Sequence, residues 1–263
     1  VFLFLDMRNS PVGIFDSGVG GLSVLYALRE LLPNEDIIYV ADQAYAPYGK
    51  RSKTEIQSRA SAMSTWLVEQ GCKLIVVACN TATTNAITQL RETFSVPFVG
   101  IEPAIKPAAL GSTTGVVGVL ATEGTLSSEL FQTTAQDYAK DIEVITQVGH
   151  GLVDLIEAGK ATSVEAKVQL QQALAPMLEK PIDHLVLGCT HYPFLQKTLQ
   201  DILPKNVRIV DCGKAVAKQT HRLLDQHQLL QNGNGHTTYF STLAPNLSLW
   251  QLFDIANVTQ IAI

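Results

Sequence analysis

The chain has 263 residues, 46% of them hydrophobic, which is enough for one large domain or two modest domains with a substantial core. Its formal net charge of −5 argues against a nucleic-acid partner, and no apolar run reaches the roughly 18–20 residues of a membrane span. The four cysteines form no CxxC pair, which indicates reduced thiols in a cytoplasmic protein.

The first hundred residues alternate between predicted strands and helices. The motif Asp16-Ser17-Gly18-Val19-Gly20-Gly21 leads from the first strand into a helix, and a loop rich in turn-forming residues, 45–49, follows the second strand. A long helix is predicted over 53–70. Strands are predicted at residues 12–15, 37–41, 74–77 and 96–99.

The third of these strands leads directly to a cysteine. Cys79 is followed by Asn80 and Thr81, which are suited to beginning a helix. Ligand sites in open α/β sheets favour this position at the carboxyl end of a strand. The first N–H groups of the helix also favour a thiolate there, so Cys79 is a candidate functional residue.

The second half of the chain repeats this arrangement. Strands are predicted at 116–120, 142–146 and 184–187, and the last leads to Cys189 and Thr190. Downstream, the segment 207–210 corresponds to the strand at 96–99 of the first half. Each half therefore brings one thiol to the end of a strand, which points to two similar α/β halves.

Strand and helix alternation predicts an α/β fold with mostly parallel sheets and two pseudosymmetric domains. We expect the chain to enter the second domain near residue 100 and to return near residue 208. The first domain would then comprise 1–100 and 208–263, and the second domain 101–207. In the returning segment we expect helices at 213–228 and 247–253 and a strand at 237–241.

Three other interpretations fit the motifs less well. The glycine turn and Asp42 suit a dinucleotide site, but Ser23 replaces the third glycine of that fingerprint and Asp16 precedes the turn. Cys189 and His191 have a spacing that suits a metal, but no other cluster supplies the remaining ligands. A Cys–His hydrolase would give the second cysteine turn no role.

Paired thiols suit the transfer of a proton from one face of a carbon to the other. Cys79 would remove the proton as a thiolate while Cys189 returns one from behind, or the reverse, with Asp16 or His191 holding or relaying a proton. This chemistry needs neither a cofactor nor a metal. Candidate donors to the developing negative charge are the hydroxyl groups of Ser17, Thr81 and Thr190.

Four motifs resemble the cofactor-independent aspartate/glutamate racemase superfamily, and most closely its glutamate racemases. The resemblance covers residues 12–210 in order. The motifs are Asp16-Ser17-Gly18-Val19-Gly20-Gly21, Pro47-Tyr48-Gly49, Ala78-Cys79-Asn80-Thr81-Ala82 and Leu187-Gly188-Cys189-Thr190-His191-Tyr192-Pro193. The resemblance implies two flavodoxin-like domains with the active site at their interface and a role in supplying D-glutamate for bacterial peptidoglycan.

The resemblance also implies residue roles. Cys79 and Cys189 would be the two catalytic bases, assisted by Asp16 and His191, with Glu157 as a secondary candidate. The substrate-binding candidates are Asp16, Ser17, Pro47, Tyr48, Gly49, Asn80, Thr81, Thr122, Thr190 and His191.

One segment departs from the family pattern. Gly149-His150-Gly151 stands where many members have a Cys-Pro pair, which weakens the assignment of Glu157. His191 and Asp16 favour glutamate over aspartate as substrate. An aspartate racemase, another amino-acid racemase and a two-lobed amino-acid-binding protein without chemistry are the alternatives. The resemblance leaves open a homodimer and regulation by a cell-wall precursor.

Overall fold

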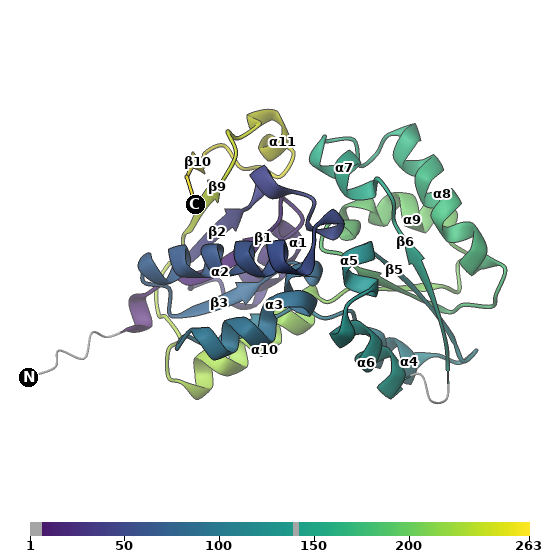
Figure 1. Cartoon of the computed structure of the whole chain (residues 1–263), viewed down its shortest axis with the longest axis horizontal. Helices are drawn as coiled ribbons and strands as arrows, with labels where there is room; N and C mark the ends of the chain where they lie inside the picture. The colour runs from purple at the N-terminus through teal and green to yellow at the C-terminus, as the bar shows by residue number, and fades with distance from the viewer. Residues whose placement is uncertain (1–6, 139–141) are drawn as a thin grey trace, which may run out of the picture.

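The computed structural model describes residues 7–138 and 142–263, and within them the chain forms two lobes, each built on a sheet of parallel strands (Figure 1). One sheet has six strands in the order β10-β9-β2-β1-β3-β4, and the other has four in the order β6-β5-β7-β8. Every strand pair in both sheets is parallel. The predicted α/β class is therefore confirmed.

The first domain is made from both ends of the chain. Its N-terminal part alternates strictly between strands and helices. Its C-terminal part adds two helices, and two strands that extend the sheet at the β2 edge. The elements are β1 (Val12–Asp16), α1 (Leu22–Leu31), β2 (Ile37–Ala41), α2 (Lys53–Glu69), β3 (Leu74–Val77), α3 (Asn80–Thr93), β4 (Phe98–Gly100), α10 (Gly213–Gln226), β9 (Thr237–Ser241), α11 (Leu247–Gln251) and β10 (Thr259–Gln260).

The second domain is formed by the middle of the chain, which is teal and green in Figure 1. Helices again alternate with its strands. The elements are α4 (Ile105–Gly111), β5 (Val116–Ala121), α5 (Glu123–Leu126), α6 (Glu129–Tyr138), β6 (Glu143–Val148), α7 (Leu152–Glu157), α8 (Val164–Leu178), β7 (His184–Gly188), α9 (Gln196–Ile202) and β8 (Arg208–Val210).

The two halves have the same strand order, β2-β1-β3-β4 and β6-β5-β7-β8, which is the flavodoxin-like arrangement. This common order makes β3 and β7 equivalent strands. The expected return of the chain at residue 208 is wrong, because β8 pairs with β7 in the second sheet. The chain leaves the second sheet only after Val210. The strand β10 was not predicted.

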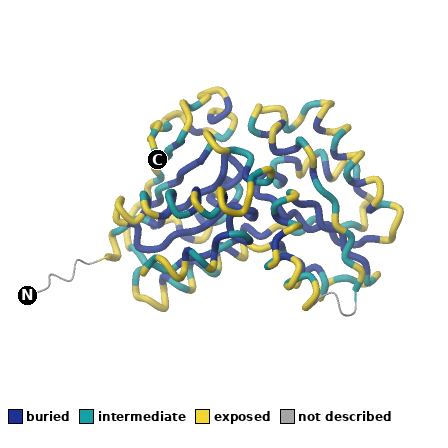
Figure 2. Tube along the Cα trace, viewed as in Figure 1, coloured by how far each residue is buried: buried dark blue, intermediate teal, exposed yellow. Residues whose placement is uncertain are grey.

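The central strands β1, β3, β5 and β7 are buried along their whole length (Figure 2). Helices cover both faces of such parallel sheets, which is why these segments are mainly apolar and do not alternate. The exceptions are Asp16 at the end of β1 and His184 at the start of β7. The edge strand β6 has half-buried and exposed residues instead. No helix in the described ranges combines the length and the apolar character that crossing a membrane requires.

Candidate active site

Both cysteines that follow a central strand line the same small cavity between the domains. Cys79 follows β3 and Cys189 follows β7, so the two thiols come from equivalent positions of the two halves. The free volume of the cavity is about 10 Å³, which is room for about one water molecule. The lining residues are Ser17, Pro47, Tyr48, Gly49, Cys79, Asn80, Thr81, Thr122, Val153, Cys189, Thr190 and His191.

Cys79 caps the N-terminus of α3. Its sulfur accepts a hydrogen bond from the Ala82 N–H at 3.5 Å, and its S–H points to the Ser17 hydroxyl oxygen at 3.9 Å. Burial raises the pKa of the Cys79 thiol, and the charge of Asp16 raises it further, whereas the Ala82 N–H lowers it. The helix therefore favours the thiolate as predicted, but its effect is smaller than that of burial.

Cys189 lies beside His191, which in turn contacts Glu157. The Cys189 sulfur is 3.8 Å from His191 Nδ1, and His191 Nε2 is 2.6 Å from Glu157 Oε1. Burial lowers the pKa of His191, but its contacts with Cys189 and Glu157 raise that pKa more, to well above the ordinary value. Burial raises the pKa of Glu157, but its contacts with His191, Gln43 and Val19 together lower that pKa below the ordinary value. The two side chains are therefore an imidazolium and a carboxylate at neutral pH.

The glycine turn after β1 receives these two side chains. The Val19 N–H donates to Glu157 Oε1 at 2.7 Å. The Gly20 N–H lies 3.2 Å from His191 Nε2, but a ring nitrogen that donates to Glu157 cannot also accept from Gly20. A Cβ on Gly18 would lie 1.9 Å from Glu157 Oε1, and one on Gly20 would lie 2.2 Å from His191 Nδ1. The turn that suits a phosphate by sequence thus holds a carboxylate and an imidazole of the protein.

Asp16 lies behind the wall of the cavity and is not among its lining residues. Its carboxylate accepts hydrogen bonds from the Gly18 N–H at 2.8 Å and from the Thr190 hydroxyl at 2.9 Å. Burial raises the pKa of Asp16, and the charge of His191 opposes that shift. Thr190 and Ser17 therefore separate Asp16 from the space that the two thiols share.

Comparison with known proteins shows the family of the chain. The profile of the Asp/Glu/Hydantoin racemase family matches residues 22–220. A glutamate racemase of Herpetosiphon aurantiacus is 52% identical over 224 residues, which cover 85% of this chain and 88% of that protein. The chain belongs to this racemase family.

Two solved structures of racemases share the whole architecture. Escherichia coli glutamate racemase in complex with L-glutamate and the activator UDP-MurNAc-ala superposes with a TM-score of 0.86 at 35% identity, covering 96% of this chain and 98% of that one. Francisella tularensis glutamate racemase in complex with D-glutamate superposes with a TM-score of 0.85 at 30% identity, covering 97% of this chain and 98% of that one. The predicted family, fold and enzyme class are confirmed.

Among the racemase site candidates, Asn80 has a side chain with no internal partner. Both polar atoms of its amide are buried and find no hydrogen-bond partner among the described residues, although the side chain lines the cavity. An unpaired buried amide is costly unless something binds it. Asn80 is therefore placed to meet a ligand.

Thr81 and Thr122, also binding candidates, contact each other across the domain boundary. Their hydroxyl oxygens are 2.8 Å apart, and the hydroxyl of Thr125 lies 3.2 Å from the first and 3.0 Å from the second. Thr125 was not predicted from the sequence. Thr122 is the capping residue of α5 and Thr125 lies inside this short helix, so nothing in the local sequence marks it.

Tyr48 lines the cavity with its hydroxyl already engaged. The hydroxyl donates to Asp42 at 2.5 Å, and the same carboxylate accepts two bonds from Arg59, each 2.9 Å long. Asp42 is thus part of a buried ion pair with Arg59, which leaves it unavailable for the ribose of a dinucleotide. Burial, followed by the charge of Asp42, raises the pKa of Tyr48 well above its ordinary value.

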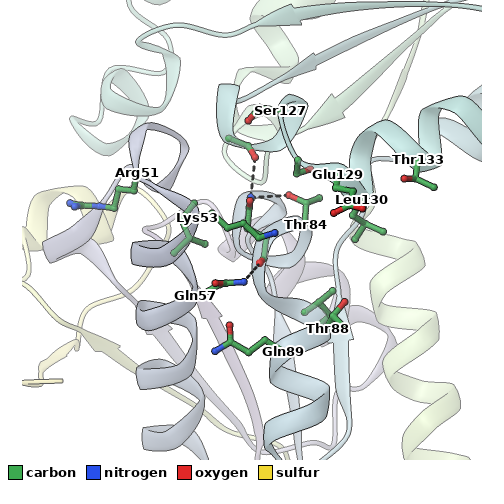
Figure 3. Close-up of a pocket in the computed structure, with 15 residues that line it drawn as sticks. Arg51, Lys53, Gln57, Thr84, Thr88, Gln89, Ser127, Glu129, Leu130 and Thr133 are labelled. Atoms are coloured by element: carbon green, nitrogen blue, oxygen red, sulfur yellow. Dashed lines mark hydrogen bonds between the residues drawn. The ribbon is translucent and has the colours of Figure 1, made fainter.

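A larger groove of about 720 Å³ lies between α2 and α3 on one side and α5 and α6 on the other (Figure 3). Thr84, Thr88, Ser127 and Glu129 are among its lining residues, and no cysteine is. The smaller cavity is therefore the candidate active site, because its lining residues include the two cysteines and those of the larger groove do not. Within residues 7–138 and 142–263, no three His, Cys, Asp or Glu side chains lie together as a metal-ion site would require.

Proposed function

We propose that the protein interconverts L- and D-glutamate by a two-base mechanism in which Cys79 and Cys189 act on opposite faces of the α-carbon. The observation that carries the proposal is the shared cavity, to which equivalent strands of the two domains each contribute one thiol. A stereocentre is inverted when one base removes its proton and a conjugate acid delivers another from behind. Two related halves facing one cavity supply that pair.

In the reaction, one cysteine accepts the α-proton as a thiolate and the other thiol gives its proton to the opposite face. The electron pair left on carbon delocalises into the α-carboxylate. The raised pKa of Cys79 reflects a buried cavity and the charge of Asp16. The α-ammonium group of a bound amino acid would bring positive charge into that cavity and stabilise the thiolate.

His191 and Glu157 assist at Cys189. The imidazolium is 3.8 Å from the Cys189 sulfur, so it stabilises the thiolate that forms when this cysteine gives up its proton. Glu157 holds the ring in place and, after Cys189, contributes to its raised pKa. Ser17 and Asn80 line the same cavity and can donate hydrogen bonds to the carboxylate on which negative charge develops. The hydroxyl of Thr190, which also lines the cavity, already donates to Asp16 and holds that carboxylate in place.

The choice of glutamate rests on the relatives, since those from Escherichia coli and Francisella tularensis hold L- and D-glutamate. We further propose that the enzyme works in the cytoplasm and supplies D-glutamate for peptidoglycan. Homodimer formation and a response to a cell-wall precursor stay predictions. A protein that binds an amino acid without chemistry has no need of two cysteines, and the experiment below separates the two.

The test is racemisation of L-glutamate in deuterated water, followed by chiral analysis and by proton NMR of the α-hydrogen. We expect D-glutamate to appear with deuterium, while the remaining L-glutamate keeps its proton at early times, because different sulfurs remove and deliver the proton. Cys79→Ser and Cys189→Ser should each lose about 10²–10⁴-fold in rate. Cys72→Ala, which changes a core cysteine outside the cavity, should retain activity. A single serine variant that racemises at the wild-type rate would contradict the mechanism, and absence of exchange in the wild type would favour a binding protein.

A further inference from the structure

The cavity that holds the two thiols is too small for the proposed substrate. Its free volume of about 10 Å³ suits about one water molecule, and an amino acid is several times larger. The structure is therefore a closed form, and a passage must open before glutamate can enter or leave.

A second cavity adjoins the first and marks that passage. It has a volume of about 40 Å³ and shares Pro47, Gly49, Thr122 and Val153 with the cysteine cavity. We call it the vestibule. The other side of the vestibule is formed by the beginning of α7 and the segment before it, including His150. The shared residues place the vestibule next to the cysteine cavity, and its exposed lining residues Lys50, His150 and Asp154 connect it to the surface.

One ion pair connects the two domains at the vestibule. Lys50 Nζ lies 2.7 Å from Asp154 Oδ2, and both residues line this cavity. Lys50 ends the turn Tyr48–Lys50, whose first two residues line the cysteine cavity. Asp154 follows Val153, which lines both cavities. The pair thus joins two segments that both form walls of the site.

The ion pair between Lys50 and Asp154 is weak enough for either residue to change its partner. Its side chains are 65% and 47% exposed, so water screens the attraction and the pair stabilises the fold little. The chain as a whole has a net charge of −5, which repels an acidic substrate. Lys50 therefore supplies local positive charge at the vestibule, where Glu123 and Asp154 are the acidic lining residues.

We propose that Lys50 and Asp154 form a latch over the substrate entrance. The incoming dicarboxylate replaces Asp154 as the partner of the Lys50 ammonium group, the two domains separate there, and the pair forms again once the substrate has passed. Lys50 is then a specificity-determining residue that selects anionic amino acids at entry. This inference rests on the proposed glutamate racemase function.

The test compares Lys50→Met, Asp154→Asn and a matched control, Lys180→Met. Lys180 forms an ion pair of similar exposure, 54% and 51%, with Glu143, and neither residue lines the vestibule or the cysteine cavity. The readouts are kcat/KM for L-glutamate across a range of salt concentrations and equilibrium binding of L-glutamate by calorimetry. The binding measurement does not require turnover.

At low salt, Lys50→Met should lower kcat/KM about tenfold and flatten its dependence on salt. Asp154→Asn should leave kcat/KM unchanged or raise it, because the ammonium group loses its competitor. Lys180→Met should behave as the wild type. The latch is overturned if Lys50→Met matches the control, or if Asp154→Asn loses as much as Lys50→Met, which would indicate a merely structural pair. A wild type that neither binds nor racemises glutamate overturns the proposed function, and the latch with it.

Discussion

The Glu157 carboxylate lies 2.6 Å from the His191 imidazole, one at the end of α7 and the other just after β7. The Val19 N–H and the Gln43 amide hold the same carboxylate at 2.7 and 2.8 Å. Glu157 is thus fixed by both domains and fixes the ring that faces Cys189. The segment Gly149-His150-Gly151 departs from the family pattern. Glu157 is nevertheless held in place by these contacts with Val19, Gln43 and His191.

Replacing Glu157 by Gln should lower the pKa of His191. Cys189 and then Glu157 raise the pKa of His191 against the effect of burial, so removal of the carboxylate leaves only Cys189 to oppose burial and shifts the ring toward its neutral form. A His NMR titration would measure the pKa, and the high-pH limb of the kcat/KM profile should move to lower pH in parallel. Glu165→Gln, an exposed position on α8, serves as the control. An unchanged His191 titration would show that Glu157 does not set the charge of the ring.

Gly20→Ala should impair catalysis while leaving the fold intact. The added Cβ would lie 2.2 Å from His191 Nδ1, so the ring must leave its place beside Cys189. A displacement of this size costs about 10²-fold in kcat. Gly233→Ala is the matched control, because its nearest neighbour would be 3.9 Å away. Equal kcat values for the two variants, with unchanged circular dichroism, would contradict the role of the turn.

The sequence was informative wherever function depends on strand ends. An apolar run that stops at a cysteine predicts the carboxyl end of a buried strand, and its repetition predicted that Cys79 and Cys189 belong to equivalent positions. The same repeat indicates the sheet to which β8 belongs, against the expected return of the chain near residue 208. The segment of β8 corresponds to β4, the last strand of the first half, so it belongs to the second sheet, where it pairs with β7.

Contacts between distant segments could not be predicted in this way. Gly20 and His191 are 171 residues apart, and a glycine turn alone does not reveal which side chain it admits. Asp42 likewise suits a ribose in sequence, but its partner Arg59 comes from the middle of α2, where a helical arginine usually faces solvent. Local patterns specify the strand ends, whereas tertiary packing decides what fills the space between them.

The Asp42–Arg59 pair yields a prediction about stability. Asp42 is fully buried and accepts bonds from Arg59, Tyr48 and Thr242. Asp42→Ala should lower the free energy of unfolding by about 3–5 kcal/mol, because it leaves a largely buried guanidinium without its partner. Glu143→Ala, which breaks an exposed pair, should cost about 0–1 kcal/mol. Urea denaturation of the wild type and the two variants measures both values. Similar losses of unfolding free energy in the two variants would mean that the buried pair stabilises the fold no more than the exposed pair.

Asn80→Ala should weaken substrate binding without destabilising the protein. Most buried amides cannot be removed freely, because their partners are left unpaired. Asn80 has no such partner among the described residues, and alanine is the better helix former at the first position of α3. Urea denaturation should therefore give the variant a free energy of unfolding equal to or above that of the wild type.

The binding effect of the same variant should be large. A hydrogen bond to a charged group contributes about 1.5–3 kcal/mol, so the loss of one from Asn80 to a carboxylate of glutamate should raise KM about 10–100-fold. Asn85→Ala provides the contrast on the same helix. The Asn85 amide donates to the carbonyl oxygens of Thr81 at 2.8 Å and Gly124 at 3.0 Å, so this variant should lose stability. If Asn80→Ala kept the wild-type KM, the unpaired amide would not be a substrate contact.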